Sequence, residues 1–304
     1  MKNIARRKFL AASAALVGVA MLDSSFSFKT KSPQLAFSTL GCPDWTFKQI
    51  VDFAVKNNFQ GIEVRGILRQ LDLPKCPEFG KEQIATTMQM MNDNNLKFVD
   101  LGSGSSLHFP ESADRRKNID EGKRFIDLAH ELKCPYIRVF PNNFLKERSK
   151  EETMDLMAKG LLELGDYAKK SDVTVLTETH GDLIVIDDLV KVMKAAEHEK
   201  VGLVWDIVNM WIKTKEPVSS AYQKLKKYIR HTHIKNAKLV NDNIVYTRIK
   251  EGEVPIFEAI DLLSKGGYSG FYSFEWEKLW HPELEAPELA IANYAQEMIH
   301  HFQR

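Results

Sequence analysis

The sequence has only three cysteines in 304 residues, and their spacing matches no zinc motif. We expect Cys42, Cys76 and Cys134 to be small buried thiols rather than a disulfide or a nucleophile, which argues against a disulfide-built extracellular fold. Walker loops, heptads, tandem repeats and low-complexity linkers are also missing. These absences speak against a P-loop nucleotide hydrolase, a coiled coil and a repeat array, and they favour one domain.

Charge of one sign is lacking as well. The formal net charge is +1, but the first 30 residues carry +4, which leaves −3 for the remainder. A remainder without excess positive charge speaks against a nucleic-acid partner. Hydrophobic residues make up 44% and charged residues 27%, so the chain can bury a sizeable core and is neither disordered nor collagen-like.

Long apolar runs are also scarce. The run Ala11–Leu22 is uncharged but only twelve residues long, too short to span a bilayer comfortably, so no stable membrane insertion is expected. It follows Arg6-Arg7-Lys8-Phe9-Leu10, which resembles a bacterial twin-arginine signal. The pattern predicts an export signal over residues 1–30, a periplasmic location and a folded domain over 31–304. The alternative is a basic, frayed N-terminus on a cytoplasmic protein.

What the chain does contain is a regular alternation of short apolar runs and helix-period segments, with strand starts 26 to 40 residues apart. Eight such βα units predict a single (β/α)8 TIM barrel. A doubly wound sheet is the alternative, but the first strand is followed by Gly41-Cys42-Pro43-Asp44 and not by a glycine-rich phosphate turn. The predicted strands are Leu35–Thr39, Gly61–Val64, Lys97–Leu101, Tyr136–Phe140, Val173–Thr179, Gly202–Asp206, His231–Lys235 and Phe271–Glu275. The predicted helices include Thr46–Asn58, a capped run from Ser149 to about Lys170, Asp187–His198, Val218–Ile229, Pro255–Lys265 and Pro287–Phe302.

Polar residues end the last four predicted strands, where a barrel gathers its chemistry. We call these residues the quartet: Glu178, Asp206, His233 and Glu275. Buried carboxylates and imidazoles need partners. Three carboxylates and one imidazole would suit one divalent ion, namely Mn²⁺, Mg²⁺, Co²⁺ or Zn²⁺. For each residue singly, a salt bridge or a helix cap is the alternative.

From about residue 35 onward, several ordered motifs resemble the xylose isomerase-like TIM barrels, which include sugar phosphate isomerases and epimerases. The motifs are Thr-Glu-Thr-His at 177–180, Trp-Asp-Ile-Val-Asn at 205–209, His-Ile-Lys-Asn at 233–236, Glu-Gly-Glu-Val-Pro at 251–255 and Gly-Tyr-Ser-Gly-Phe-Tyr-Ser-Phe-Glu at 267–275. The resemblance implies that the quartet holds the metal. It also implies that Glu178 and Glu275 exchange the substrate proton from opposite sides through an enediolate.

Further residues are candidates for substrate contact. His180 is expected either to touch substrate or to support a ligand, and Lys235 is either an electrophile or a charge partner of Asp206. Asn209 stands where many family epimerases have a histidine, so its role is expected to be binding rather than acid–base catalysis. The others are Glu63 and Arg65 at the end of the second strand, Arg138, Lys278, and the aromatic candidates Trp45, Trp211 and Trp276 near strand ends. The alternatives are plain salt bridges for the first three, a solvated side chain for Lys278 and ordinary packing for the tryptophans. His231 and His281 are expected to be structural.

The leading prediction is a metal-dependent sugar isomerase or epimerase acting on a small carbohydrate. Because no basic or glycine-rich phosphate anchor stands out, an unphosphorylated sugar or glycoside is expected. The alternatives are a lyase or hydrolase of 3-keto-glycosides, an endonuclease IV-like nuclease and a non-catalytic sugar-binding barrel. Homodimerisation is an expectation from the resemblance alone.

Overall fold

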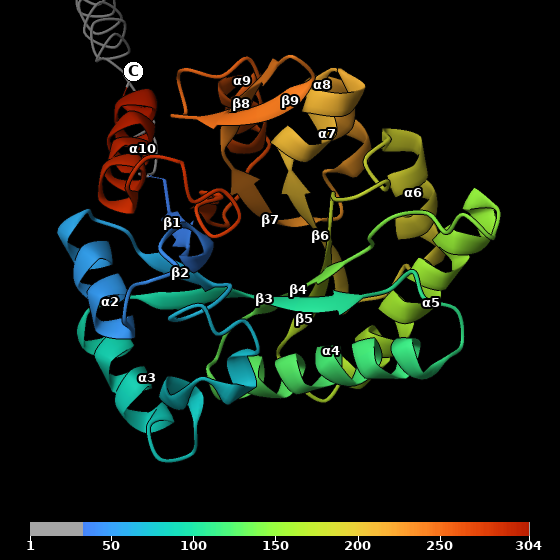
Figure 1. Ribbon diagram of the computed structural model, residues 1–304, viewed down its shortest axis with the longest axis horizontal. Coiled ribbons are helices and arrows are strands. Elements are labelled where there is room, and N and C mark those ends of the chain that lie inside the picture. The colour runs from blue at the N-terminus through green and yellow to red at the C-terminus, as the bar shows by residue number, and fades with distance from the viewer. Residues whose placement is uncertain (1–32, 304) are drawn as a thin grey trace, which may run out of the picture. The chain divides into compact units, whose positions relative to one another are not determined.

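The computed structural model describes residues 33–303, in which eight parallel strands close into a barrel in the order β1-β10-β7-β6-β5-β4-β3-β2 (Figure 1). Every neighbouring pair is parallel, including the closing pair β1 and β10. The predicted (β/α)8 barrel is confirmed. The barrel strands are β1 (Leu35–Ser38), β2 (Gly61–Val64), β3 (Lys97–Ser106), β4 (Tyr136–Phe140), β5 (Thr174–Glu178), β6 (Val201–Asp206), β7 (Ile229–Ile234) and β10 (Tyr272–Phe274).

Helices connect the strands and surround the barrel (Figure 1). They are α2 (Phe47–Lys56), α3 (Ile84–Asp93), α4 (Ala113–Glu131), α5 (Lys150–Ala168), α6 (Ile186–Ala195), α7 (Ile207–Thr214), α8 (Val218–Leu225), α9 (Ile256–Lys265) and α10 (Pro287–Phe302). Short 3₁₀ turns occur at Thr39–Gly41, Leu73–Lys75 and Pro77–Phe79. The expected helix from Ser149 begins with a complete capping box, in which Ser149 and Glu152 each satisfy a backbone N–H of the other.

The core lies between the barrel and these helices. Strands β1, β2 and β6 are buried along their whole length, as their non-alternating apolar sequences indicate. Phe37, Phe274 and Tyr294 illustrate the packing, since Phe274 stacks on Tyr294 and α10 is thereby held against the barrel. The rigid strands fix the positions of the residues at their carboxyl ends.

A two-stranded antiparallel hairpin, β8 (Asn236–Val240) and β9 (Asn243–Thr247), follows β7 and was not predicted from the sequence. The two turn residues Asn241 and Asp242 both have positive φ, which is typical of a tight hairpin turn. The side chain of Asn236 fastens the hairpin base, because its Oδ1 accepts from Val254 N at 3.1 Å. A Cβ at residue 252 would lie 2.1 Å from that oxygen, so only glycine fits there.

The three cysteines are free and buried, as predicted. The third strand runs to Ser106, five residues beyond the predicted end, because its small residues continue the extended backbone.

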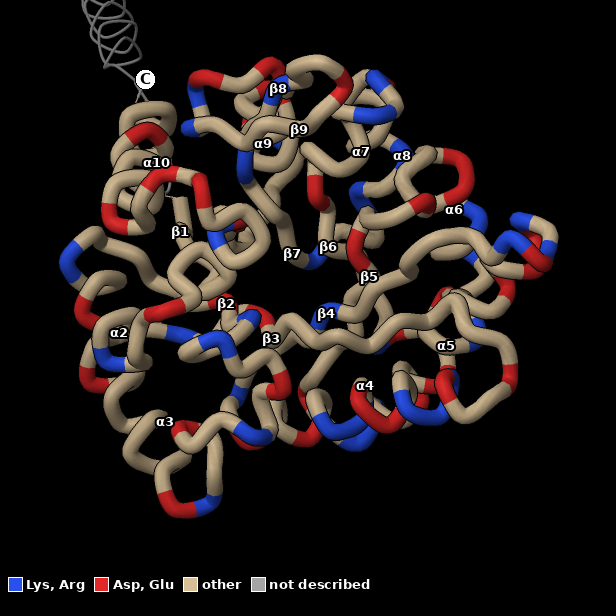
Figure 2. Tube along the Cα trace, viewed as in Figure 1, with Lys and Arg blue, Asp and Glu red and all other residues tan. Residues whose placement is uncertain are grey.

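Within residues 33–303, no helix is both long and apolar enough to cross a membrane. Lysines and arginines are interspersed with acidic residues along the outer helices (Figure 2). The predicted export signal at 1–30 lies outside the described residues.

Candidate metal and substrate site

The structure brings the quartet together at the carboxyl ends of β5, β6, β7 and β10. One potential ligand atom from each residue lies within 4.8 Å of the others, and all four residues are buried. Ligand bonds of about 2 Å place opposed ligands about 4 Å apart, so a single ion needs only a small contraction of this cluster. Glu178 Oε2 and Asp206 Oδ2 are buried, and although Arg138 Nε lies 3.1 Å from the first and Lys235 Nζ lies 2.8 Å from the second, neither oxygen accepts a well-aligned hydrogen bond from residues 33–303. Such carboxylate oxygens fit a divalent cation.

His233 is at the centre of this arrangement. Its Nδ1 lies 3.2 Å from Glu275 Oε2 and 3.3 Å from Glu178 Oε1, while Asp206 Oδ2 is 3.7 Å away. Burial alone would lower the pKa of this imidazole, but the surrounding carboxylates raise it well above its usual value. The site therefore favours positive charge next to Nδ1, which a metal ion would also supply.

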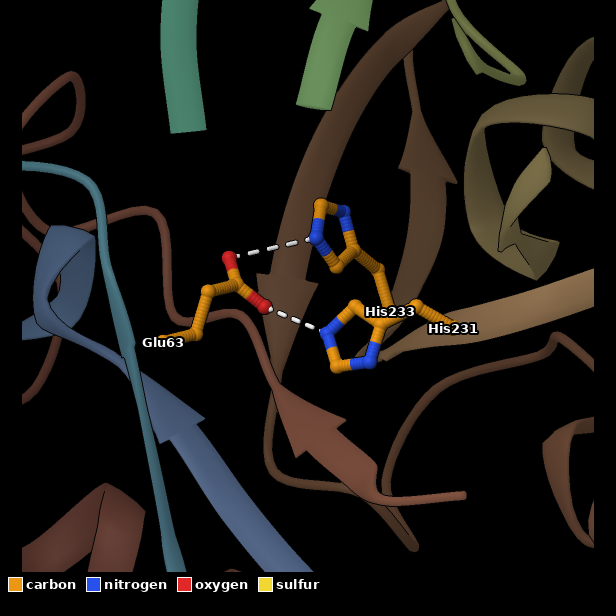
Figure 3. Close-up of side chains that lie close together, drawn as sticks. All are labelled: Glu63, His231 and His233. Atoms are coloured by element: carbon orange, nitrogen blue, oxygen red, sulfur yellow. Dashed lines mark hydrogen bonds and ion pairs between the residues drawn. The ribbon is translucent and has the colours of Figure 1, made fainter. Parts of the chain in front are cut away.

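The other ring nitrogen of His233 faces Glu63, as Figure 3 shows. Glu63 Oε1 lies 3.2 Å from His233 Nε2, and Glu63 Oε2 lies 2.9 Å from His231 Nε2. Ser273 donates a further hydrogen bond of 2.8 Å to Glu63 Oε2. Burial raises the pKa of Glu63, but the two histidines hold it well below its usual value. Glu63, expected from the sequence to contact substrate, is 1% exposed and supports the quartet histidine instead.

Lys235 is the charge partner of Asp206, one of the two roles considered for it. Its Nζ lies 2.8 Å from Asp206 Oδ2, 2.6 Å from Glu275 Oε2 and 2.5 Å from Glu277 Oε1. Burial by itself would lower the pKa of Lys235, but these three carboxylates raise it well above its usual value. Lys235 thus stays charged and fixes the direction of the acidic side chains.

Arg138 and Asn209 restrain Glu178. Arg138 Nε lies 3.1 Å from Glu178 Oε2, and its guanidinium stands 3.8 Å over the Phe140 ring. Asn209 donates to Glu178 Oε1 at 3.3 Å, and its backbone N–H is capped by Asp206 Oδ1 at 2.8 Å. Asp206 therefore contributes one oxygen to the start of α7, while its other oxygen faces Lys235 and the quartet histidine.

A cavity of about 290 Å³ opens over the quartet, near the lower limit of small-molecule sites. A larger cavity of about 440 Å³ lies at the opposite end of the barrel, but it is lined by no carboxylate. The residues lining the smaller cavity are Leu40, Arg65, Arg138, Phe140, Glu178, His180, Asn209, Tyr246, Glu275, Glu277 and Trp280.

The three tryptophans expected to contact substrate do not line this cavity. Trp45 packs against Phe53, Trp211 lies beneath Lys215, and Trp276 is buried with its Nε1 donating to a backbone carbonyl. Trp280 does line the cavity, although 54% of its surface is exposed. A position near a strand end therefore did not determine where each indole ring points.

Lys278, another expected substrate contact, donates to Pro282 O at 2.7 Å and fastens its own loop. Phe140, Tyr246 and Glu277 also line the cavity and were not predicted from the sequence. The position of Glu277 could have been predicted, because it follows Glu275 by two residues and so lies on the same side of the extended segment. Tyr246 follows the turn residues Asn241 and Asp242 in an apolar run, a pattern typical of a hairpin strand, but the hairpin was not predicted.

The fold of residues 33–303 is that of a recognised family of TIM barrels. The family model for the xylose isomerase-like TIM barrel matches residues 51–298, and the chain belongs to that family.

Individual relatives are more distant. A 3-dehydroshikimate dehydratase of Bacillus anthracis is 25% identical over 226 residues, which cover 71% of this chain and 78% of that protein. A solved structure of the IOLI protein with a bound zinc atom has a TM-score of 0.76 at 18% identity, covering 89% of this chain and 98% of that one. A D-allulose 3-epimerase from Methylomonas sp. has a TM-score of 0.71 at 13% identity, with 89% and 98% covered. At these identities the two structural likenesses show the fold.

Proposed function

We propose that the protein is an enzyme that binds one divalent metal ion and moves a proton next to the carbonyl group of a small polyhydroxylated substrate. Sugar epimerisation or isomerisation is the leading reaction. The observation that carries the proposal is the convergence of Glu178 and Glu275 on His233 Nδ1, where both carboxylates line a cavity of small-molecule size. Bound zinc in the IOLI protein and the activity named for the Methylomonas protein support it.

The quartet residues would hold the ion, which as a Lewis acid would polarise a substrate carbonyl and make the adjacent C–H more acidic. Glu178 would remove the proton and Glu275 would return it, or the reverse, because both carboxylates line the cavity in which the substrate would lie. Arg138 and Lys235 would keep these carboxylates ionised and oriented. His180 and Asn209 border the cavity, where they would bind substrate hydroxyl groups.

Elimination is the second candidate, because the same proton abstraction can expel a group from the next carbon. Burial raises the pKa of Glu277 to about 7, even though Lys235 opposes that shift. A carboxyl group of this kind is partly protonated at neutral pH and could donate its proton to a departing hydroxyl. The activity named for the Bacillus anthracis relative is a dehydration, which supports this candidate, as it supports the related cleavage of 3-keto-glycosides.

The test is solvent exchange during turnover. The chelator-treated protein is reloaded with Mn²⁺ or Zn²⁺ and incubated in D₂O with ketoses, aldoses, 3-keto-glycosides and 3-dehydroshikimate. Epimerisation or isomerisation gives a deuterated sugar isomer by NMR, whereas elimination gives an unsaturated product that absorbs in the ultraviolet. Glu178→Gln and Glu275→Gln should abolish turnover, and Glu283→Gln, a change at an exposed carboxylate, should not. Full turnover in the first two variants with metal bound would contradict the proposal.

We also propose that residues 1–30 direct export to the periplasm. The support is the sequence pattern of Arg6 and Arg7 ahead of the apolar run. A reporter fused to this segment should reach the periplasm, and the double change Arg6→Lys with Arg7→Lys should retain it in the cytoplasm. Equal export of both fusions would argue against a twin-arginine route.

A further inference from the structure

Arg65 is a buried cation without a carboxylate partner. It follows β2 directly, is 6% exposed and borders the cavity above the quartet. Within residues 33–303 its side chain makes one hydrogen bond, in which Nη1 donates to Gly102 O over a long distance of 3.5 Å. A guanidinium has five N–H donors, so most of its hydrogen-bonding capacity is not used by the protein.

No carboxylate among residues 33–303 lies within ion-pair distance of Arg65. Glu121, Glu275 and Glu178 attract the guanidinium only from farther away. Burial and the nearby Arg138 cation lower the pKa of Arg65 to about 10, so the side chain remains charged at neutral pH. A buried charge with so little compensation is costly, and it is retained more readily where a ligand supplies the missing partner.

The backbone is shaped to admit this arrangement. A Cβ at residue 102 would lie 2.8 Å from Arg65 Cδ and 3.0 Å from Arg138 Nη2, so glycine lets both guanidinium groups pass over β3. The two arginines differ in their partners, because Arg138 is paired with Glu178 while Arg65 is not. Arg65 is therefore the cation in this part of the cavity that is left for a ligand.

The position of Arg65 gives the cavity two unlike sides. In the closed barrel, β2 lies directly across from β6, which carries Asp206 of the quartet. A substrate whose carbonyl end lies at the quartet would extend toward Arg65 at its other end.

We infer that the substrate carries a carboxylate, held by Arg65 opposite the metal-binding side, so that the substrate class is hydroxylated carbonyl acids rather than neutral sugars. This inference rests on the proposed function. A carboxylate matches the planar fork of one guanidinium with two parallel hydrogen bonds. Phosphate is less suitable, because the helix N-terminus that borders the cavity, at Asn209 of α7, is already capped by Asp206 Oδ1, and no glycine lines the cavity to bind the third phosphate oxygen.

The test compares matched acid and neutral ligands by calorimetry on the Mn²⁺-loaded protein. The pairs are D-galacturonate with D-galactose and D-glucuronate with D-glucose, and D-glucose 6-phosphate represents phosphate. Each acid should bind at least about ten-fold more tightly than its neutral partner, since hydrogen bonds to charged groups have this size. Arg65→Met should remove the preference for each acid over its neutral partner. Arg69→Met, at an exposed arginine paired with Asp44, is the matched control.

The possible outcomes are distinct. Equal binding of acids and neutral sugars by the unaltered protein, or no binding of any acid, overturns the inference, as does an acid preference that survives Arg65→Met. Tighter binding of the phosphate ester than of both uronates also overturns it. The thermal midpoint of Arg65→Met should be unchanged or higher, because an uncompensated buried charge is removed; a clear fall would show a structural role instead. Arg65→Lys, which keeps the charge, should retain part of the acid preference. Turnover of neutral sugars with deuterium uptake but no acid preference would sustain the proposed function and reject this inference.

Discussion

Replacing Glu63 with glutamine should weaken metal binding although Glu63 is not one of the expected ligands. Glu63 Oε2 accepts hydrogen bonds from His231 and Ser273, and its Oε1 faces His233 Nε2 at 3.2 Å. A glutamine would keep its carbonyl oxygen toward the two donors, which leaves its NH₂ group against His233 Nε2. That nitrogen would then have to accept a hydrogen bond, and the ring proton would move to Nδ1, the atom that faces the quartet carboxylates.

The size of the effect follows from this change of tautomer. Changing the partner that orients a ligating histidine typically costs 10- to 100-fold in metal affinity. That range corresponds to about 1.4 to 2.7 kcal/mol of binding free energy. We expect Glu63→Gln to lie at the upper end, because the substitution removes a buried negative charge as well as the acceptor.

The assay is competition between the protein and a fluorescent chelator for Zn²⁺ or Mn²⁺ at pH 7.5. Glu283→Gln is the matched control, since Glu283 is an exposed carboxylate 3.3 Å from His281 Nδ1. Circular dichroism and the thermal midpoint verify that both variants are folded. An unchanged dissociation constant in folded Glu63→Gln would refute the role given to Glu63 in orienting His233.

Three further predictions concern buried charge and burial. Lys235→Met should lower the free energy of unfolding by about 3–5 kcal/mol in urea titrations, because three buried carboxylates lose their cation, whereas the exposed Lys238→Met should have little effect. Burial raises the pKa of Asp100 to about 7, so the folded state binds the proton more tightly than the unfolded state. The free energy of unfolding should therefore fall as the pH rises from about 4 to about 7. Asp100→Asn should remove this loss, which amounts to at most about 4 kcal/mol, and equal pH profiles of the metal-free proteins would contradict the assignment. Burial raises the pKa of the Cys42 and Cys134 thiols, so a thiol reagent at pH 8 should modify them only after denaturation.

The barrel and the quartet could be predicted because both depend on order along the chain. Apolar β-branched runs at regular intervals gave the strands, and residues of ligand type at the ends of four successive strands converge whenever those strands close a barrel. Glu178 and Glu275 came together for this reason.

Features that depend on side-chain direction or on distant packing could not be predicted in the same way. Glu63 sits at a strand end as the quartet does, but its contact with His233 depends on a rotamer and on a partner across the barrel. Trp276 lies beside Glu275 in sequence and yet is buried away from the cavity. The hairpin was not predicted although its strands carry apolar residues such as Leu239 and Val245, because both strands are short and fall outside the regular spacing of the barrel strands.

The hairpin has a consequence for how specificity can change. The quartet residues are borne by the barrel strands or follow them directly, whereas Tyr246 reaches the cavity from β9, which pairs with β8 and with no barrel strand. Asn236 and the close approach of Gly252 fix only the base of the hairpin. Insertions, deletions or exchange of residues 238–246 can therefore alter which substrates fit while the metal-binding carboxylates keep their positions. This separation gives laboratory evolution of new substrate preferences a segment to vary that carries little of the barrel's stability.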